Sequence, residues 1–135
     1  MKTLPTDLKM LDTIYERYYK TFAAFSEDNK NRTTKNFVSI DIKKIAEDMK
    51  VDPDIIFGRL YYHMEQKYGY KQEDGSNVHF FTLAIGNDRH CINFPYMASV
   101  LAELREKNRK YRIATTIAIF SLFVSVIALL LSIFI

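Results

Sequence analysis

The chain has 135 residues, of which 48% are hydrophobic and 26% charged. This length allows one compact domain with one appendage and excludes a large multidomain enzyme. The formal net charge of +3 is the balance of 19 basic and 16 acidic residues, all of which precede position 113. The composition therefore divides the chain into a charged body and an uncharged, apolar end.

Hydrophobic residues recur at spacings of three and four between Leu8 and Phe25, which is the periodicity of one face of an α-helix. We predict a first helix from about Thr6 to Phe25, capped by Thr6 or Asp7. Residues 26–36 contain no hydrophobic side chain, so we expect a mobile connection there.

A short extended segment at residues 37–40 is predicted to lead into a second helix. Ser39 or Asp41 can cap this helix at its N-terminus. Its hydrophobic residues share one face and are Ile42, Ile45, Ala46 and Met49.

Asp52 and Pro53 mark the start of a third helix, because aspartate is a good capping residue and proline suits the first helical position. We expect this helix to run to about Lys67. Residues 77–85 are rich in β-forming residues, a Gly-Asn-Asp turn follows, and residues 89–94 are expected to form the return strand of a hairpin.

This order of elements resembles the winged helix-turn-helix superfamily over about residues 5–94. The stretch SIDIKKIAEDMKVDPDIIFGRLYYHM is similar to its paired second and third helices. The resemblance implies a mainly α fold with a small β-hairpin (α+β). It also implies that the third helix and the wing at residues 86–89 form the contact surface. Many such domains read a DNA major groove, and many others bind only protein.

Helical geometry divides the third helix into two faces at about 100° per residue. The face expected in the core holds Ile56, Phe57, Leu60, Tyr61 and Met64. The predicted contact face holds Asp54, Ile55, Gly58, Arg59, Tyr62, Glu65 and Gln66, and the wing adds Arg89 and His90.

The formal charge of this contact face of the helix is −1. Phosphate contacts dominate the affinity of DNA-binding proteins, so a negative face favours a protein partner over DNA. Ile55 and Tyr62 also suit a protein interface. Base reading by Arg59 and Gln66 stays open as an alternative.

Residues with other chemistry are few. The single cysteine, Cys91, excludes an intrachain disulfide and agrees with a reducing compartment. It does not form a zinc-site spacing with His63, His79 or His90. We therefore expect no metal or cofactor, and no catalytic residues, because no nucleophile and base or carboxylate pair stands out.

The uncharged end, residues 113–135, predicts a transmembrane helix. Its 23 residues would span roughly 34 Å as a helix, enough for a hydrocarbon core of about 30 Å. We expect it to continue a helix that begins at Pro95, which divides the chain into a body at 1–94, a basic juxtamembrane helix at 95–112 and the membrane span.

A cluster of basic residues precedes the span and consists of Arg105, Lys107, Arg109, Lys110 and Arg112. Such clusters stay on the cytoplasmic side of a membrane and contact anionic headgroups. We therefore expect a single-pass, tail-anchored protein, without a cleavable signal peptide, whose N-terminal body is cytoplasmic. The Lys-, Asn-, Ile- and Tyr-rich composition is typical of an AT-rich genome, which could be bacterial, mobile-element or viral, and we expect a bacterial inner membrane.

Small residues recur along one stripe of the predicted span at steps of four and three. They are Ala114, Ala118, Ser121, Ser125, Ala128 and Ser132. Small residues allow close helix packing in lipid, so this seam predicts homo-oligomerisation or pairing with a partner helix. The same register extends back through Tyr111, Lys107, Leu104, Val100 and Met97.

Three functions agree with these features. The first is a membrane-tethered adaptor or regulatory subunit whose body docks a cytosolic protein. The second is a membrane-anchored DNA-binding transcriptional regulator. The third is a membrane-perturbing effector of a bacterial toxin or defence system, which would act through its packed transmembrane helices.

Overall fold

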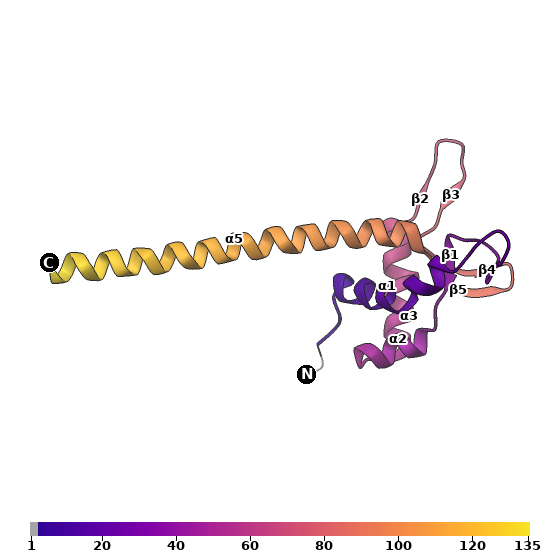
Figure 1. Cartoon of the computed structure of the whole chain (residues 1–135), viewed down its shortest axis with the longest axis horizontal. Helices are drawn as coiled ribbons and strands as arrows, with labels where there is room; N and C mark the ends of the chain where they lie inside the picture. The colour runs from indigo at the N-terminus through magenta and orange to yellow at the C-terminus, as the bar shows by residue number, and fades with distance from the viewer. Residues whose placement is uncertain (1–2) are drawn as a thin grey trace. The chain divides into compact units, whose positions relative to one another are not determined.

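A computed structural model describes residues 3–135 and shows an α+β protein. Contacts divide the chain into two compact units, the first ending at Leu101 and the second comprising Ala102–Ile135. The elements in chain order (Figure 1) are α1 (Asp7–Ala23), β1 (Phe37–Ser39), α2 (Ile42–Met49), α3 (Pro53–Gly58), the π-helical segment η1 (Arg59–Met64), α4 (Glu65–Tyr68), β2 (Tyr70–Lys71), β3 (Asn77–Val78), β4 (Phe81–Ile85), β5 (Asp88–Asn93) and α5 (Phe94–Phe134).

The predicted first helix is confirmed as α1, and Thr6 is its cap. The Thr6 hydroxyl accepts a hydrogen bond of 3.1 Å from the backbone N–H of Lys9, which satisfies one of the unpaired amides at the helix start. Met10, Leu11 and Ile14 are buried. These residues share the apolar face that the sequence periodicity predicted.

The second and third helices begin where their capping residues predicted. Asp41 caps α2 by accepting from the backbone N–H of Lys44 at 3.2 Å. Asp52 caps α3 by accepting from the N–H of Asp54 at 2.8 Å, and Pro53 occupies the first helical position. α3, η1 and α4 follow one another without a gap, so the predicted third helix extends to Tyr68.

Two small antiparallel sheets complete the first unit. In the larger sheet the strand order is β1-β5-β4, with Val38 opposite Ile92 and Phe81 also opposite Ile92. The chain turns between β4 and β5 at Gly86, whose φ of +59° is accessible at low cost to glycine. A Cβ at Gly86 would also lie 2.9 Å from the Thr33 hydroxyl.

The prediction of one β-rich segment over residues 77–85 was wrong in detail. β3 pairs with β2, with Tyr70 opposite Val78, and only β4 belongs to the larger sheet. The β2–β3 hairpin extends from the first unit in Figure 1. A strand as short as β2 has no periodic pattern that the sequence could reveal.

The connection at residues 26–36 is tied to α1 by Arg32, which the prediction of a mobile segment did not anticipate. The Arg32 guanidinium donates to the carbonyls of Thr21 at 2.9 Å and Phe22 at 3.0 Å. It also lies 4.9 Å from the ring centroid of Phe25. Arg32 therefore satisfies carbonyls at the C-terminal end of α1, and burial lowers the pKa of its guanidinium.

The core of the first unit includes the beginning of α5. Phe94 is 1% exposed, and its ring stacks on Phe22 at 4.8 Å and on Tyr15 at 5.5 Å. Met97, Val100 and Leu101 are also buried. Residues 94–101 thus contribute to the folded body as well as to the long helix.

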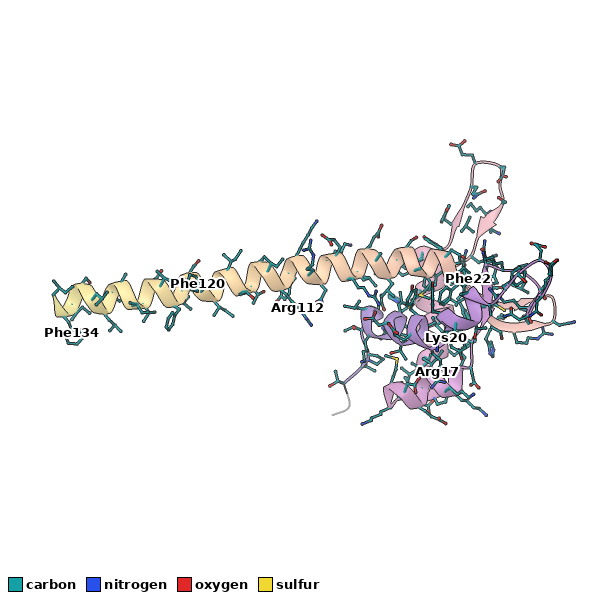
Figure 2. All side chains as sticks on the ribbon, viewed as in Figure 1. Arg17, Lys20, Phe22, Arg112, Phe120 and Phe134 are labelled. Atoms are coloured by element: carbon teal, nitrogen blue, oxygen red, sulfur yellow. The ribbon has the colours of Figure 1, made fainter. Side chains whose placement is uncertain are left out.

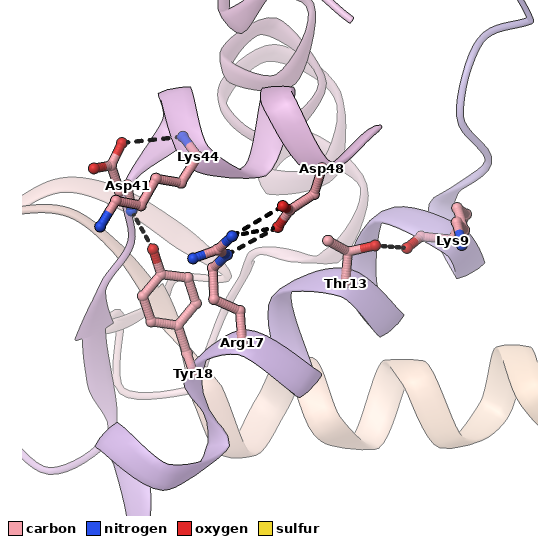
Figure 3. Close-up of polar contacts among 7 residues, drawn as sticks. All are labelled: Lys9, Thr13, Arg17, Tyr18, Asp41, Lys44 and Asp48. Atoms are coloured by element: carbon pink, nitrogen blue, oxygen red, sulfur yellow. Dashed lines mark hydrogen bonds and ion pairs between the residues drawn. The ribbon is translucent and has the colours of Figure 1, made fainter. Parts of the chain in front are cut away.

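A polar clamp joins α1 to α2 (Figure 3). Arg17 donates to the two carboxylate oxygens of Asp48 at 2.8 and 2.9 Å. The backbone N–H of Asp41 donates to the hydroxyl of Tyr18 at 2.7 Å. The hydrogen bond and charge of Arg17 hold the pKa of Asp48 below the ordinary aspartate value, whereas burial raises the pKa of Tyr18.

The Asp48 carboxylate should stabilise the first unit only while it is ionised. Because its pKa is lowered in the folded state, its contribution is present above the ordinary aspartate pKa of about 3.9 and is lost as the pH falls through the folded-state pKa. We expect Asp48→Asn to lower the melting temperature at neutral pH and to make no difference at a pH below both values. Near-ultraviolet circular dichroism of the tyrosines would measure this in detergent.

Glu47→Gln is the matched control, because Glu47 is exposed and adjacent. An equal loss of stability in the two variants, or a loss in Asp48→Asn that persists in acid, would contradict the role of the clamp.

Candidate functional site

The third helix carries its core residues on one side, as predicted. Ile56, Leu60 and Met64 are each 0% exposed. Tyr61, which we expected beside them, is 37% exposed, so that expectation was wrong. The reason is the π-helical turn of η1: its i→i+5 hydrogen bonds widen the helix, so residues inside it depart from the 100° spacing assumed for an α-helix.

Two residues of the predicted contact face are occupied within the body. Arg59 donates to a carboxylate oxygen of Asp7 at 2.9 Å, and both side chains are about four-fifths buried, with 20% and 18% exposed. Lys67 approaches the other oxygen of Asp7 at 3.8 Å. Arg59 therefore fastens the third helix to the start of α1 and is withdrawn from the contact face.

Glu65 is the second occupied residue. One of its carboxylate oxygens accepts from the backbone N–H groups of Phe80 and Phe81, both at 2.7 Å. The other lies 2.9 Å from Nδ1 of His79. Glu65 thus anchors the entry into β4, and these hydrogen bonds hold its carboxylate in place.

The third helix carries an aromatic ridge formed by the exposed residues Tyr61 and Tyr62 and by Phe57, which we expected in the core and which is half-buried. Phe57 and Tyr61 stack with ring centroids 5.3 Å apart, and Tyr61 meets Tyr62 edge to face at 4.9 Å. Tyr62 is 71% exposed, and neighbouring Ile55 is 42% exposed. Aromatic side chains that already pack against one another lose little conformational entropy when they bind another protein. Such residues are suited to the centre of a protein interface.

Two grooves adjoin this ridge. The first groove, of about 650 Å³, is lined by α2, α3 and β5, and Phe57 forms part of its wall. The second, of about 590 Å³, is lined by Tyr61, the end of the third helix and the β2–β3 hairpin. Phe57 and Tyr61 therefore each border a groove.

The wing contributes Arg89 and His90 to the first groove. His90 has φ +51°, a left-handed conformation that is uncommon outside glycine. Its carbonyl accepts from the N–H of Ile40 at 3.0 Å, and its ring lies 5.7 Å from that of Phe57. The side chain of Arg89 donates to the carbonyl of Gly86 at 3.2 Å.

The structure therefore gathers only part of the predicted contact surface. Asp54, Arg89 and His90 line the first groove, and Glu65 and Gln66 line the second. The sequence reasoning missed Lys43 and Lys44, which line the first groove from the first turn of α2. The sequence shows that both lysines lie in the first turn of the second helix. It does not show that this turn lies near the wing, because only the fold brings α2 and β5 together.

α5 is long and apolar enough to cross a membrane, and none of its most hydrophobic stretch is buried. Figure 2 shows Phe120 and Phe134 among the side chains that project from this helix.

In the preceding basic cluster, Arg109 pairs with Glu106 at 3.1 Å and Lys110 approaches the same carboxylate at 3.9 Å. Glu106 raises the pKa of Arg109.

Two hydroxyl groups of the small-residue seam donate hydrogen bonds within the helix. Ser125 donates to the carbonyl of Ser121 at 2.9 Å, and Ser132 donates to that of Leu129 at 2.8 Å. The extension of the seam toward the body was wrong, because Met97 and Val100 are buried in the first unit. Self-association through the seam stays a prediction.

Cys91 is buried, and burial raises the pKa of its thiol. Across residues 3–135, no group of three histidine, cysteine or acidic side chains is placed to hold a metal ion.

No family model matches the chain, and no curated protein or solved structure matches it.

Proposed function

We propose that this protein is a membrane-tethered winged-helix adaptor whose body docks a cytosolic protein. The fold part of this proposal is supported by the order helix, strand, helix, helix, hairpin in the first unit and by the strand order β1-β5-β4. The tether is supported by the apolar stretch of α5. The basic cluster at residues 105–112 supports a cytoplasmic position for the body.

The observation that carries the docking function is the exposed aromatic ridge. Tyr61 and Tyr62 are exposed and pack against half-buried Phe57, whereas a purely structural helix would carry solvated polar groups at its exposed positions. The one arginine of the third helix is bound to Asp7, and Lys67 approaches the same carboxylate, so both of these cations lie against an acidic group. A protein partner is therefore favoured over DNA.

The ridge is tested by Tyr62→Ala in the full-length chain, purified from membranes in mild detergent after cross-linking. Central aromatic anchors contribute about 2 kcal/mol or more to an interface, which corresponds to roughly thirtyfold in affinity. We expect at least one specific protein to be retained by the wild-type chain and lost from Tyr62→Ala. Quantitative mass spectrometry of the co-purified proteins provides the measurement.

Tyr19→Ala is the matched control, because Tyr19 is 48% exposed but lies on α1. Equal retention of every protein by wild type and Tyr62→Ala would refute docking through the ridge. Co-purified nucleic acid whose retention falls steeply with salt would instead support the DNA-binding regulator.

A further inference from the structure

The first groove has an apolar wall and a positively charged rim. Its lining includes the apolar residues Pro53 and Phe57, the carboxylates Asp41 and Asp54, and three cations, Lys43, Lys44 and Arg89, which we call its rim. A volume of about 650 Å³ is within the range of sites that enclose small ligands or a few side chains. The groove can therefore take an apolar side chain and place charged groups around it.

The positive charges of this rim are available to a partner. Within residues 3–135 the ammonium groups of Lys43 and Lys44 form no ion pair, and both residues are exposed. Arg89 donates to a neutral carbonyl. Of the two carboxylates in the groove, Asp41 already accepts from the N–H of Lys44 as a helix cap.

We propose that the first groove binds an acidic segment of the partner protein. An apolar side chain of this segment packs against Phe57, and its carboxylates lie against Lys43, Lys44 and Arg89. This inference rests on the proposed docking function and specifies the chemistry of the partner. Lysine and arginine at the rim select against basic segments by like-charge repulsion.

The same groove suits an acidic peptide better than a nucleic acid strand. Asp41 and Asp54 also line it, and a phosphate backbone carries a negative charge at every nucleotide, so some phosphates would meet these carboxylates. A peptide can place its carboxylates beside the three cations alone. A nucleic acid cannot do this, because its phosphates are evenly spaced along the backbone.

The binding test uses the full chain in phosphatidylcholine nanodiscs and three short fluorescent peptides. The first has a single leucine with two glutamates on one side of it and serine elsewhere, the second replaces both glutamates with lysine, and the third replaces the leucine with serine. By fluorescence anisotropy, we expect the glutamate–leucine peptide to bind about tenfold more tightly than either of the others. Empty nanodiscs correct for binding to lipid.

The site is tested with the double variant Lys43→Glu, Lys44→Glu. Acidic residues are favourable in the first turn of a helix, so the variant should remain folded, as near-ultraviolet circular dichroism would verify. We expect it to bind the glutamate–leucine peptide about tenfold more weakly than the wild type. The control Lys9→Glu, Lys20→Glu makes the same charge change on α1 and should bind as the wild type does.

Three results would overturn the inference. The chain could prefer the lysine peptide, or the α1 control could lose as much affinity for the glutamate–leucine peptide as Lys43→Glu, Lys44→Glu does. A single-stranded oligonucleotide could also bind more tightly than the glutamate–leucine peptide, with this binding abolished by Lys43→Glu, Lys44→Glu.

The cellular partner separates this inference from the docking proposal. A partner that depends on Tyr62 but not on Lys43 and Lys44 would leave docking intact and refute the acidic segment. A partner insensitive to both changes would refute both.

Discussion

Replacing Phe123 and Ile127 with arginine should release the protein from the membrane. Both residues lie in the apolar stretch of α5, with 63% and 41% of their surfaces exposed. An arginine near the centre of a transmembrane helix costs about 2.5–3.5 kcal/mol of insertion free energy, and the two lost apolar side chains add to this cost. The measurement is the fraction of protein in the pellet after alkaline extraction and ultracentrifugation.

Phe123→Leu with Ile127→Leu is the matched control, since it keeps the stretch apolar. We expect the control and the wild type to pellet with the membranes and the arginine variant to move largely to the supernatant. A wild-type chain that is soluble without detergent would contradict the membrane tether. It would also remove the reason for assigning the basic cluster to a membrane surface.

Replacing Phe94 with alanine should destabilise the first unit by about 3–5 kcal/mol, the usual cost of removing a buried phenylalanine. Phe94 is 1% exposed and stacks on both Tyr15 and Phe22, so its loss leaves a cavity between α1 and the start of α5. Since a domain of this size has a total stability of about 5–15 kcal/mol, the loss is a large share. Urea unfolding in detergent, followed by the near-ultraviolet signal of the tyrosines, would measure it.

Phe134→Ala makes the same chemical change at a residue that is 82% exposed in the second unit. We expect it to leave the unfolding of the first unit unchanged. If Phe94→Ala also had no effect, the folded body would end before α5, contrary to the burial of Met97, Val100 and Leu101.

These two experiments address the two roles of α5. Residues 94–101 are part of the core of the first unit, whereas the residues from position 111 onward are all exposed. One continuous helix thus has a segment stabilised by protein contacts and a segment suited to lipid. A change in the first segment is expected to unfold the body, and a change in the second to alter its location.

The difference between the predicted and observed contact surfaces has a specific cause. The sequence places Arg59 and Glu65 on the polar side of an ideal helix, and polar residues on that side are usually solvated. In the structure α1 supplies Asp7 to Arg59, and the entry to β4 supplies two N–H groups to Glu65. Helical periodicity carries no information about partners that lie far away in the chain.

Local chemistry was sufficient for the helices, their capping residues and the apolar end. Thr6, Asp41 and Asp52 cap helices because their side chains reach amides two or three residues away. Likewise, the hydrophobicity of residues 113–135 depends on composition alone. Each of these features is determined by residues close together in the sequence.

Only the tertiary structure decided which surface remains open. It pairs β1 with β5 and brings Lys43 and Lys44 together with Arg89 in the lining of one groove. These arrangements depend on contacts between residues tens of positions apart, whose free energy comes from packing and hydrogen bonding in the whole fold. Such contacts leave no periodic signal, so the sequence predicted the elements of the candidate site but not the grooves between them.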